Sequence, residues 1–136
     1  MALYGMSSVK DERLHRLFRD EKVRYLIPDQ DTDKWFNMLV LHQNRAKHGD
    51  TNYIPEYFID DMFDLVFWGH EHECRLEPEL KTFGGGGDVD VSVDPKRVYI
   101  TQPGSSVATS MIEGEAKEKK IGLLSIAGKE FRMDEA

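Results

Sequence analysis

Three of the five histidines in the sequence directly follow apolar segments whose length suits a buried strand. His42 follows residues 35–41, and His70 and His72 follow residues 65–68. Ligand sites in parallel sheets gather beyond the carboxyl ends of the strands, so these imidazoles are expected at one edge of a sheet. Neutral imidazole is a common metal ligand. The spacing therefore predicts a metal site built from His42, His70 and His72.

Each of these histidines has an alternative interpretation as a plain loop residue. A single histidine after a strand is more often a loop or capping residue than a ligand. The run Gly-His-Glu-His at residues 69–72 favours a metal, because two histidines two residues apart point the same way in an extended segment. We interpret His15, on the polar face of an expected helix, and His48, in a polar loop, as surface residues.

Four residues near these histidines bear on how a metal site would be built. Glu71, Glu73 and Asp61 could orient the imidazole rings by accepting hydrogen bonds from their second nitrogens. Cys74 could be a fourth, soft ligand, but it follows the site in a segment that returns to the core. We therefore expect Cys74 to be buried filler.

Three further residues are candidates for contact with DNA phosphates: Arg45, Lys47 and Ser105. Ser105 lies in the segment Gln-Pro-Gly-Ser-Ser at 102–106, which we interpret first as a turn, because its proline fixes one φ angle and its glycine permits a positive one. The backbone N–H groups and hydroxyls of such a turn could also meet an anion. Arg45 and Lys47 belong to a polar loop, where a solvated side chain is the commoner explanation.

The length, charge and cysteine count of the chain limit the classes of function that it can have. The chain has 136 residues, which suits a single domain, and 25 acidic against 18 basic residues give a net charge of −7. That balance weighs against a protein that holds nucleic acid through a basic surface alone, and leaves open one that holds phosphates through metal ions. The single cysteine excludes an intramolecular disulfide and indicates a reducing compartment. We expect neither a membrane span nor a secretory signal.

The apolar pattern predicts an α/β domain, with strands and helices alternating first and strands following. Helices are expected at residues 8–20, where an acidic residue follows a capping serine by three positions, and from residue 55, where a proline opens the segment. Strands are expected at residues 23–26, 35–41, 65–68, 98–101, 107–110, 121–126 and 131–133. This order favours a mixed sheet layered against helices.

Between the histidine cluster and the later strands the composition changes. Residues 84–87 are four consecutive glycines, and alternating Asp and Val follow. Because glycine loses much freedom when it is fixed, we expect a flexible Gly/Asp-rich insertion at about residues 77–97. The glycines do not form a nucleotide-binding loop, since no Gly-Lys-Ser or Gly-Lys-Thr ending follows them.

Four motifs along the chain carry a family resemblance. They are Trp-Phe-Asn at 35–37, Leu-His-Gln-Asn-Arg at 41–45, Phe-Trp-Gly-His-Glu-His-Glu-Cys at 67–74, and Gln-Pro-Gly-Ser-Ser-Val-Ala-Thr-Ser at 102–110. Together they closely resemble the eukaryotic double-strand-break repair nucleases of the meiotic recombination eleven family. The resemblance covers most of the chain except about residues 77–97.

The resemblance implies a fold, an activity and a set of partners. The family belongs to the calcineurin-like metallophosphoesterases, so the expected fold is an α/β β-sandwich with flanking helices. The implied activity is a manganese-dependent DNA nuclease, endonuclease and 3′–5′ exonuclease, in which His42 and His70 bind one Mn²⁺ and His72 the other. The implied partners are DNA, a coiled-coil ABC-type ATPase, a nibrin-like protein and a second copy of the chain, in the nucleus.

The chain departs from the family pattern by lacking the motifs of its earlier half. The family has there an Asp-x-His, a bridging aspartate and an Asn-His pair, and this sequence contains no Asp-x-His and no Asn-His. Residues 1–136 therefore look like the second, C-terminal half of the phosphodiesterase domain only. Two divalent ions about 4 Å apart repel by roughly 16 kcal/mol at an effective dielectric of 20, and neutral imidazoles offset none of it. We expect at most one weakly held ion and no efficient turnover by the isolated chain.

Two other functions stay open on the sequence. One is a non-catalytic interaction module, natural or deliberately trimmed, that keeps part of the fold to bind a DNA-repair partner. The other is a histidine-containing α/β domain that binds zinc structurally, which the lack of a second cysteine weakens. The motifs favour the nuclease as ancestry, and the missing carboxylates favour the interaction module for the isolated chain.

Overall fold

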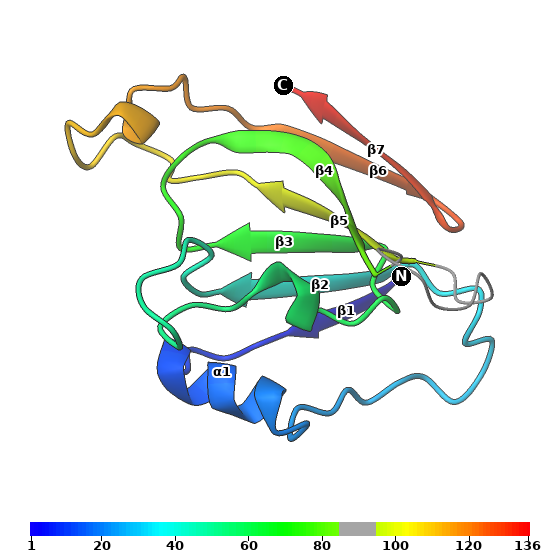
Figure 1. Ribbon diagram of the computed structural model, residues 1–136. Coiled ribbons are helices and arrows are strands. Elements are labelled where there is room, and N and C mark those ends of the chain that lie inside the picture. Colours follow the sequence, from blue (N-terminus) through cyan, green and yellow to red (C-terminus); the bar gives the residue numbers. More distant parts are fainter. Residues whose placement is uncertain (85–94) are drawn as a thin grey trace.

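Five strands form one mixed sheet in the computed structural model, which describes residues 1–84 and 95–136 (Figure 1). The strand order is β1-β2-β3-β5-β4. Four strands are parallel: β1 (Ala2–Gly5), β2 (Asn37–His42), β3 (Leu65–Gly69) and β5 (Lys96–Gln102). The fifth, β4 (Arg75–Phe83), pairs antiparallel with β5. The expectation of an α/β chain with a mixed sheet is confirmed, and the sheet is mostly parallel.

The remaining elements are short. They are the helix α1 (Asp11–Arg19), the 3₁₀ turns η1 (Glu56–Phe58) and η2 (Glu113–Glu115), and a separate antiparallel hairpin of β6 (Gly122–Ala127) and β7 (Glu130–Glu135). The expected first helix is confirmed over residues 11–19, whereas the expected serine cap is wrong, because the N-cap residue is Lys10 and makes no side-chain cap hydrogen bond. Its first turn is acidic and its last turn basic, which suits the helix dipole. No helix within the described ranges is long and apolar enough to span a membrane.

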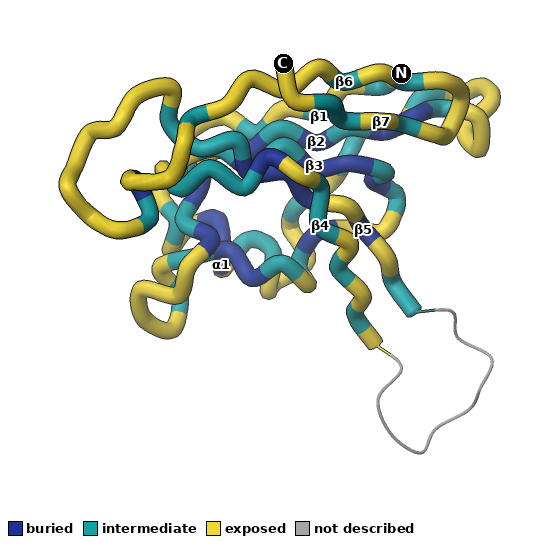
Figure 2. Tube along the Cα trace, turned by 90° about the horizontal axis from the view of Figure 1, so that it is seen from above, coloured by how far each residue is buried: buried dark blue, intermediate teal, exposed yellow. Residues whose placement is uncertain are grey.

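The core lies on one face of the sheet. Strands β2, β3 and β5 place alternate apolar side chains on this face, where residues of α1 and of the chain between β2 and β3 pack against them. Figure 2 shows α1 beside the buried strands of the sheet. The buried members are Leu14, Leu39, Leu41, Ile54, Ile59, Phe63, Val66, Trp68, Val98 and Ile100. This packing fixes where β2 and β3 end, and so where the histidines after them begin.

The β6–β7 hairpin lies on the opposite face. Phe131 of β7 packs edge-on against Phe36 and Tyr99, with ring centroids 5.7 and 5.2 Å apart. Tyr99 and the core residue Ile100 are consecutive in β5, so their side chains point to opposite faces. The hairpin covers this face only in part, since Leu3 and Tyr99 are exposed.

Three expected elements are wrong. Residues 23–26 form no strand, and Tyr25 instead packs edge-on against Phe63. The segment from residue 55 yields only η1, because the carboxylate of Asp60 accepts a hydrogen bond from the N–H of Met62 and so competes with a helix. Residues 107–110 form no strand, because a carboxylate takes two of their N–H groups.

The expected insertion at 77–97 is wrong at both of its ends. Residues 77–83 belong to β4 and residues 96–97 to β5, and the two strands pair from Phe83 opposite Lys96 onward. Residues 79–83 are held in a strand by pairing with β5, and this pairing is not visible in the local composition. The glycines at 85–87 and the alternating Asp and Val at 88–94 lie outside the described residues.

Candidate metal centre

The carboxyl ends of β2 and β3 bring the first two histidines together. His42 is the last residue of β2 and lies in register with Gly69, the last residue of β3. A Cβ at position 69 would lie 3.0 Å from Nδ1 of His42 and 3.2 Å from the carbonyl oxygen of Leu41, so a side chain here would have to push the His42 ring or the backbone of Leu41 aside. His70 follows with a φ of +81°, a left-handed backbone conformation that is uncommon for residues other than glycine.

The imidazoles of His42 and His70 form a convergent pair. Nδ1 of His70 lies 3.3 Å from Nε2 of His42, and the ring planes are inclined by 73°. Two nitrogens bound to one divalent ion at about 2.1 Å would lie about 3 Å apart, so this spacing fits a shared metal ion. Both histidines are exposed, and an ion could reach them from solvent.

His72 is held by a different part of the chain. Its Nδ1 lies 2.6 Å from Oε1 of Glu115 and 2.9 Å from Oγ1 of Thr109. The side chain of His72 is half-exposed, whereas that of Glu115 is only 2% exposed. The structure thus pairs His42 with His70 and gives His72 its own surroundings.

The three predicted ligands do not form one cluster. In residues 1–84 and 95–136, no group of three His, Cys, Asp or Glu side chains lies close enough to hold a metal ion. The grouping of His42 with His70, and of His72 apart, is the grouping that the family resemblance implies. Metal binding at these residues stays a prediction.

The acidic residues beside the histidines do not orient the rings as expected. Oε1 of Glu71 accepts hydrogen bonds from the N–H groups of Arg45 and Ala46, at 2.7 and 3.1 Å. Glu73 pairs with Lys117, which lowers the pKa of its carboxyl. Glu71 therefore ties the loop after β2 to the loop after β3. The residue that does contact a predicted ligand, Glu115, is 43 positions from His72 and gave no signal in the histidine spacing.

Arg45 lies in a buried ion-pair network, so its interpretation as a solvated loop residue is wrong. Its side chain is 5% exposed. The guanidinium donates to Glu56 at 2.7 Å, to Glu79 at 3.3 Å and to Oε1 of Gln102 at 2.7 Å. It also lies 5.7 Å from the ring centroid of Trp68. These partners leave the guanidinium little surface for contact with DNA.

The other two candidate phosphate contacts differ in accessibility. Lys47 is exposed, and its nearest carboxylate, that of Asp50, lies 3.7 Å away. The hydroxyl of Ser105 donates to the carbonyl of Val107 and accepts from Nζ of Lys119, so it helps to hold its own loop. Lys119, which the sequence interpretation missed, also donates to the carbonyl of His72 at 2.7 Å.

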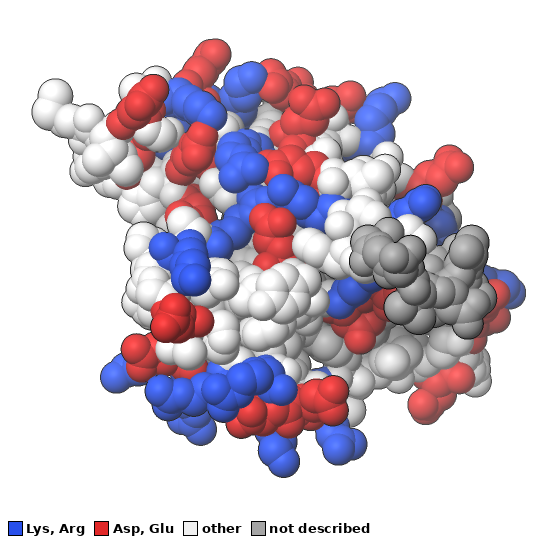
Figure 3. All heavy atoms as spheres, viewed as in Figure 1, with Lys and Arg blue, Asp and Glu red and all other residues white. Residues whose placement is uncertain are grey.

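Charges of both signs are mixed over the surface. On the face shown in Figure 3, Lys and Arg side chains are interspersed with Asp and Glu, in agreement with the net charge of −7. Individual lysines such as Lys47 are thus better candidates for phosphate contact than that face as a whole.

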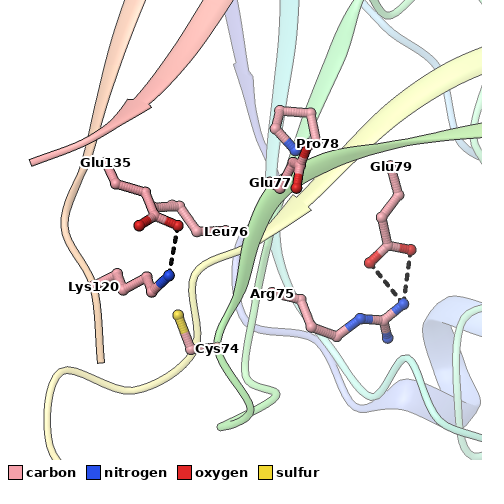
Figure 4. Close-up of a pocket in the computed structure, with 8 residues that line it drawn as sticks. All are labelled: Cys74, Arg75, Leu76, Glu77, Pro78, Glu79, Lys120 and Glu135. Atoms are coloured by element: carbon pink, nitrogen blue, oxygen red, sulfur yellow. Dashed lines mark hydrogen bonds and ion pairs between the residues drawn. The ribbon is translucent and has the colours of Figure 1, made fainter. Parts of the chain in front are cut away.

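Cys74 lies away from the histidine pair, on the wall of an open cavity of about 390 Å³ (Figure 4). It is half-buried, so its expected role as core filler holds only in part. The cavity also has two ion pairs in its wall, Lys120 with Glu135 and Arg75 with Glu79, both at 2.6 Å. Four of the five charged residues that line the cavity are therefore paired with one another, and Glu77 is the fifth.

His15 was expected on the surface and is buried. It is 8% exposed, its Nδ1 lies 2.9 Å from the carbonyl oxygen of Tyr53, and its ring packs edge-on against Phe58. His15 therefore anchors α1 to the segment before η1. His48 is exposed, as expected.

Comparison of the sequence with curated proteins finds relatives that cover nearly the whole chain. Three curated relatives named double-strand break repair protein MRE11, from Gallus gallus, Homo sapiens and Coprinopsis cinerea, are each 50% identical to the chain over 133 residues, 98% of its length. The aligned segment is 17%, 17% and 16% of these relatives, so the chain spans about a sixth of their length. No protein-family model matches the chain. Over nearly its whole length, therefore, the chain is homologous to a segment of the MRE11 double-strand break repair proteins.

Proposed function

We propose that this chain is the part of a double-strand break repair nuclease that supplies histidine ligands to its manganese centre. The observation that carries this proposal is the 3.3 Å approach of the His42 and His70 nitrogens at the ends of β2 and β3. Homology to proteins named for double-strand break repair supports the biological role. The proposed activity is manganese-dependent cleavage of DNA phosphodiesters, by endonuclease and 3′–5′ exonuclease action.

Within such a centre the residues of this chain have distinct tasks. His42 and His70 would hold one ion, and His72 would contribute to a second. Glu71 keeps the two loops in contact through the N–H groups of Arg45 and Ala46. A bound manganese ion would supply positive charge that stabilises a phosphoryl group in the transition state.

The proposal extends to the fold and the partners. We propose that the five-stranded sheet and the β6–β7 hairpin are part of a calcineurin-like β-sandwich. The incompletely covered sheet face supports this, because a further layer would bury it. The carboxylate ligands would then come from the part of the family domain that these residues lack, and the chain alone would not turn over efficiently. DNA, a coiled-coil ABC-type ATPase, a nibrin-like protein and a second copy are the proposed partners, in the nucleus.

Manganese titration of the purified chain tests the proposal. We expect weak binding, observed by electron paramagnetic resonance, and a loss of roughly tenfold or more in affinity for His70→Ala. His48→Ala is the matched control, because His48 is an exposed histidine in a polar loop. Equal affinity of both variants would contradict the site. A DNA hairpin incubated with Mn²⁺ and the chain should stay uncut, and robust cleavage would refute the need for further ligands.

A further inference from the structure

Glu115 is a buried carboxylate whose every oxygen is hydrogen-bonded. Oε2 accepts from the backbone N–H groups of Thr109 and Ser110, and Oε1 contacts the Thr109 hydroxyl at 2.8 Å and Nδ1 of His72 at 2.6 Å. Burial alone would raise the pKa of Glu115, but hydrogen bonds from Ser110, Thr109 and His72 outweigh it and lower the pKa to about 2. Two main-chain N–H groups donate to Oε2 and stabilise its negative charge, so the group facing His72 is an ionised carboxylate at neutral pH.

This contact decides which nitrogen of His72 carries the proton. An ionised carboxylate only accepts hydrogen bonds, so the Nδ1 that faces it must donate. A neutral imidazole has one N–H, which leaves the lone pair on Nε2. Two main-chain N–H groups fix the orientation of the Glu115 carboxylate through Oε2. Oε1 therefore points toward His72 as a hydrogen-bond acceptor, whichever nitrogen of His72 carries the proton.

We propose that Glu115 is a positioning residue that holds His72 in the Nδ1–H form and so keeps the lone pair of Nε2 free for a divalent cation. The binding of a cation by His72 rests on the proposed function, whereas the tautomer of His72 follows from its contact with Glu115 alone. Glu115 thereby links the loop of residues 105–115 to the histidine site, since Nε2 of His72 is free for a cation only when Glu115 contacts Nδ1.

Glu115→Gln separates this role from simple packing, because glutamine keeps the size and shape of the side chain. The two main-chain N–H groups still need an acceptor, so the amide oxygen will face them and the amide NH₂ will face Nδ1 of His72. Nδ1 must then accept, and the proton moves to Nε2, where it blocks the metal-binding lone pair. Glu113→Gln, at an exposed position of the same η2 turn, is the matched control.

The decisive measurement is the ¹⁵N chemical shift of the His72 ring nitrogens in the whole chain at pH 8 without metal. We expect Nδ1–H in the wild type and in Glu113→Gln, and Nε2–H in Glu115→Gln. Nε2–H in the wild type overturns the proposal, even if Glu115→Gln fails to fold.

The two proposals fail in different ways. An unchanged tautomer in folded Glu115→Gln also overturns the positioning role, and manganese binding by the wild type would then leave the proposed function standing. The expected tautomers without manganese binding would support the positioning role and remove the proposed function.

Discussion

At the scale of single residues, two buried charges organise the loops around the histidines. Glu115 gathers the N–H groups of Thr109 and Ser110, and Arg45 gathers Glu56, Glu79 and Gln102. The histidines could be predicted from sequence because they lie at or just beyond the ends of two apolar strands. Neither buried charge could be, because a charged residue in a polar loop is normally solvated, and the contacts of Glu115 with His72 and of Arg45 with Gln102 join residues 43 and 57 positions apart.

The depressed pKa of Glu115 predicts how stability depends on pH. Its pKa is about 2 in the folded chain against an ordinary value of 4.5, so the unfolded chain takes up the proton first as the pH falls. The contribution of Glu115 is present above about pH 4.5 and is lost as the pH falls toward 2. Urea unfolding at pH 5 and pH 3 should therefore show a smaller loss of stability for Glu115→Gln than for the wild type. Glu113→Gln should behave as the wild type, and an equal loss in all three proteins would contradict the assignment.

Gly104 allows the loop after β5 to lie against the backbone of the histidine loop. Its φ is +77°, and a Cβ there would lie 2.6 Å from the carbonyl oxygen of His72. Gly128 in the β6–β7 turn has a φ of +60° and open space around it. We expect Gly128→Ala to lower the free energy of unfolding by about 1 kcal/mol through backbone strain alone, and Gly104→Ala by at least about 2 kcal/mol. Equal losses for Gly104→Ala and Gly128→Ala in chemical denaturation would show that the close approach of Gly104 to the His72 carbonyl does not affect stability.

At the scale of elements, the hydrophobic period located α1, β2, β3, β5 and the β6–β7 hairpin. It failed where a side chain competes for backbone hydrogen bonds, as Asp60 does after η1 and Glu115 does at residues 109–110. It also missed β1, because four residues at a sheet edge carry too short a pattern. Those competing contacts join residues only two to six positions apart, but they are made by polar side chains, so the spacing of apolar residues does not contain them.

The Arg45 network joins the loop after β2 to η1, β4 and β5. Glu56 and Glu79 are about a quarter exposed, so the loss on removing Arg45 should be below that of a fully buried pair. We expect Arg45→Met to lower the free energy of unfolding by about 2–3 kcal/mol, because two carboxylates and Gln102 lose a partner. Lys47→Met, an exposed position of the same loop, should change it by less than about 0.5 kcal/mol. Similar effects of the two substitutions in urea titrations would argue against a structural role for Arg45.

At the scale of the whole molecule, the sheet has one well-covered face and one that the hairpin covers in part. Leu3, Met38, Leu65 and Tyr99 form a row across the second face through their registered positions. Leu65 is fully buried in this row, whereas Leu3 is 62% exposed. The sequence indicated buried strands, but it could not show how much of the second face this chain covers by itself.

We expect the chain to associate through this second face as its concentration rises. Leu3→Lys should reduce association, because a charge on the exposed row must be desolvated on contact. Ile112→Lys is the control, since Ile112 is also 62% exposed but lies in the loop before η2. Light scattering of the three proteins over a concentration series gives the comparison. A wild-type chain that stays monomeric and melts above about 60 °C would show that its core is complete.

The distance along the chain between His42 and Glu115 has a consequence for synthesis on the ribosome. At roughly 5–20 residues per second, Glu115 is made about 4–15 s after His42. The strands β2 and β3, with their histidines, leave the ribosome before the carboxylate that contacts Nδ1 of His72 exists. A nascent chain can thus bring out His42, His70 and His72 seconds before the residue that settles the protonation of His72 is made.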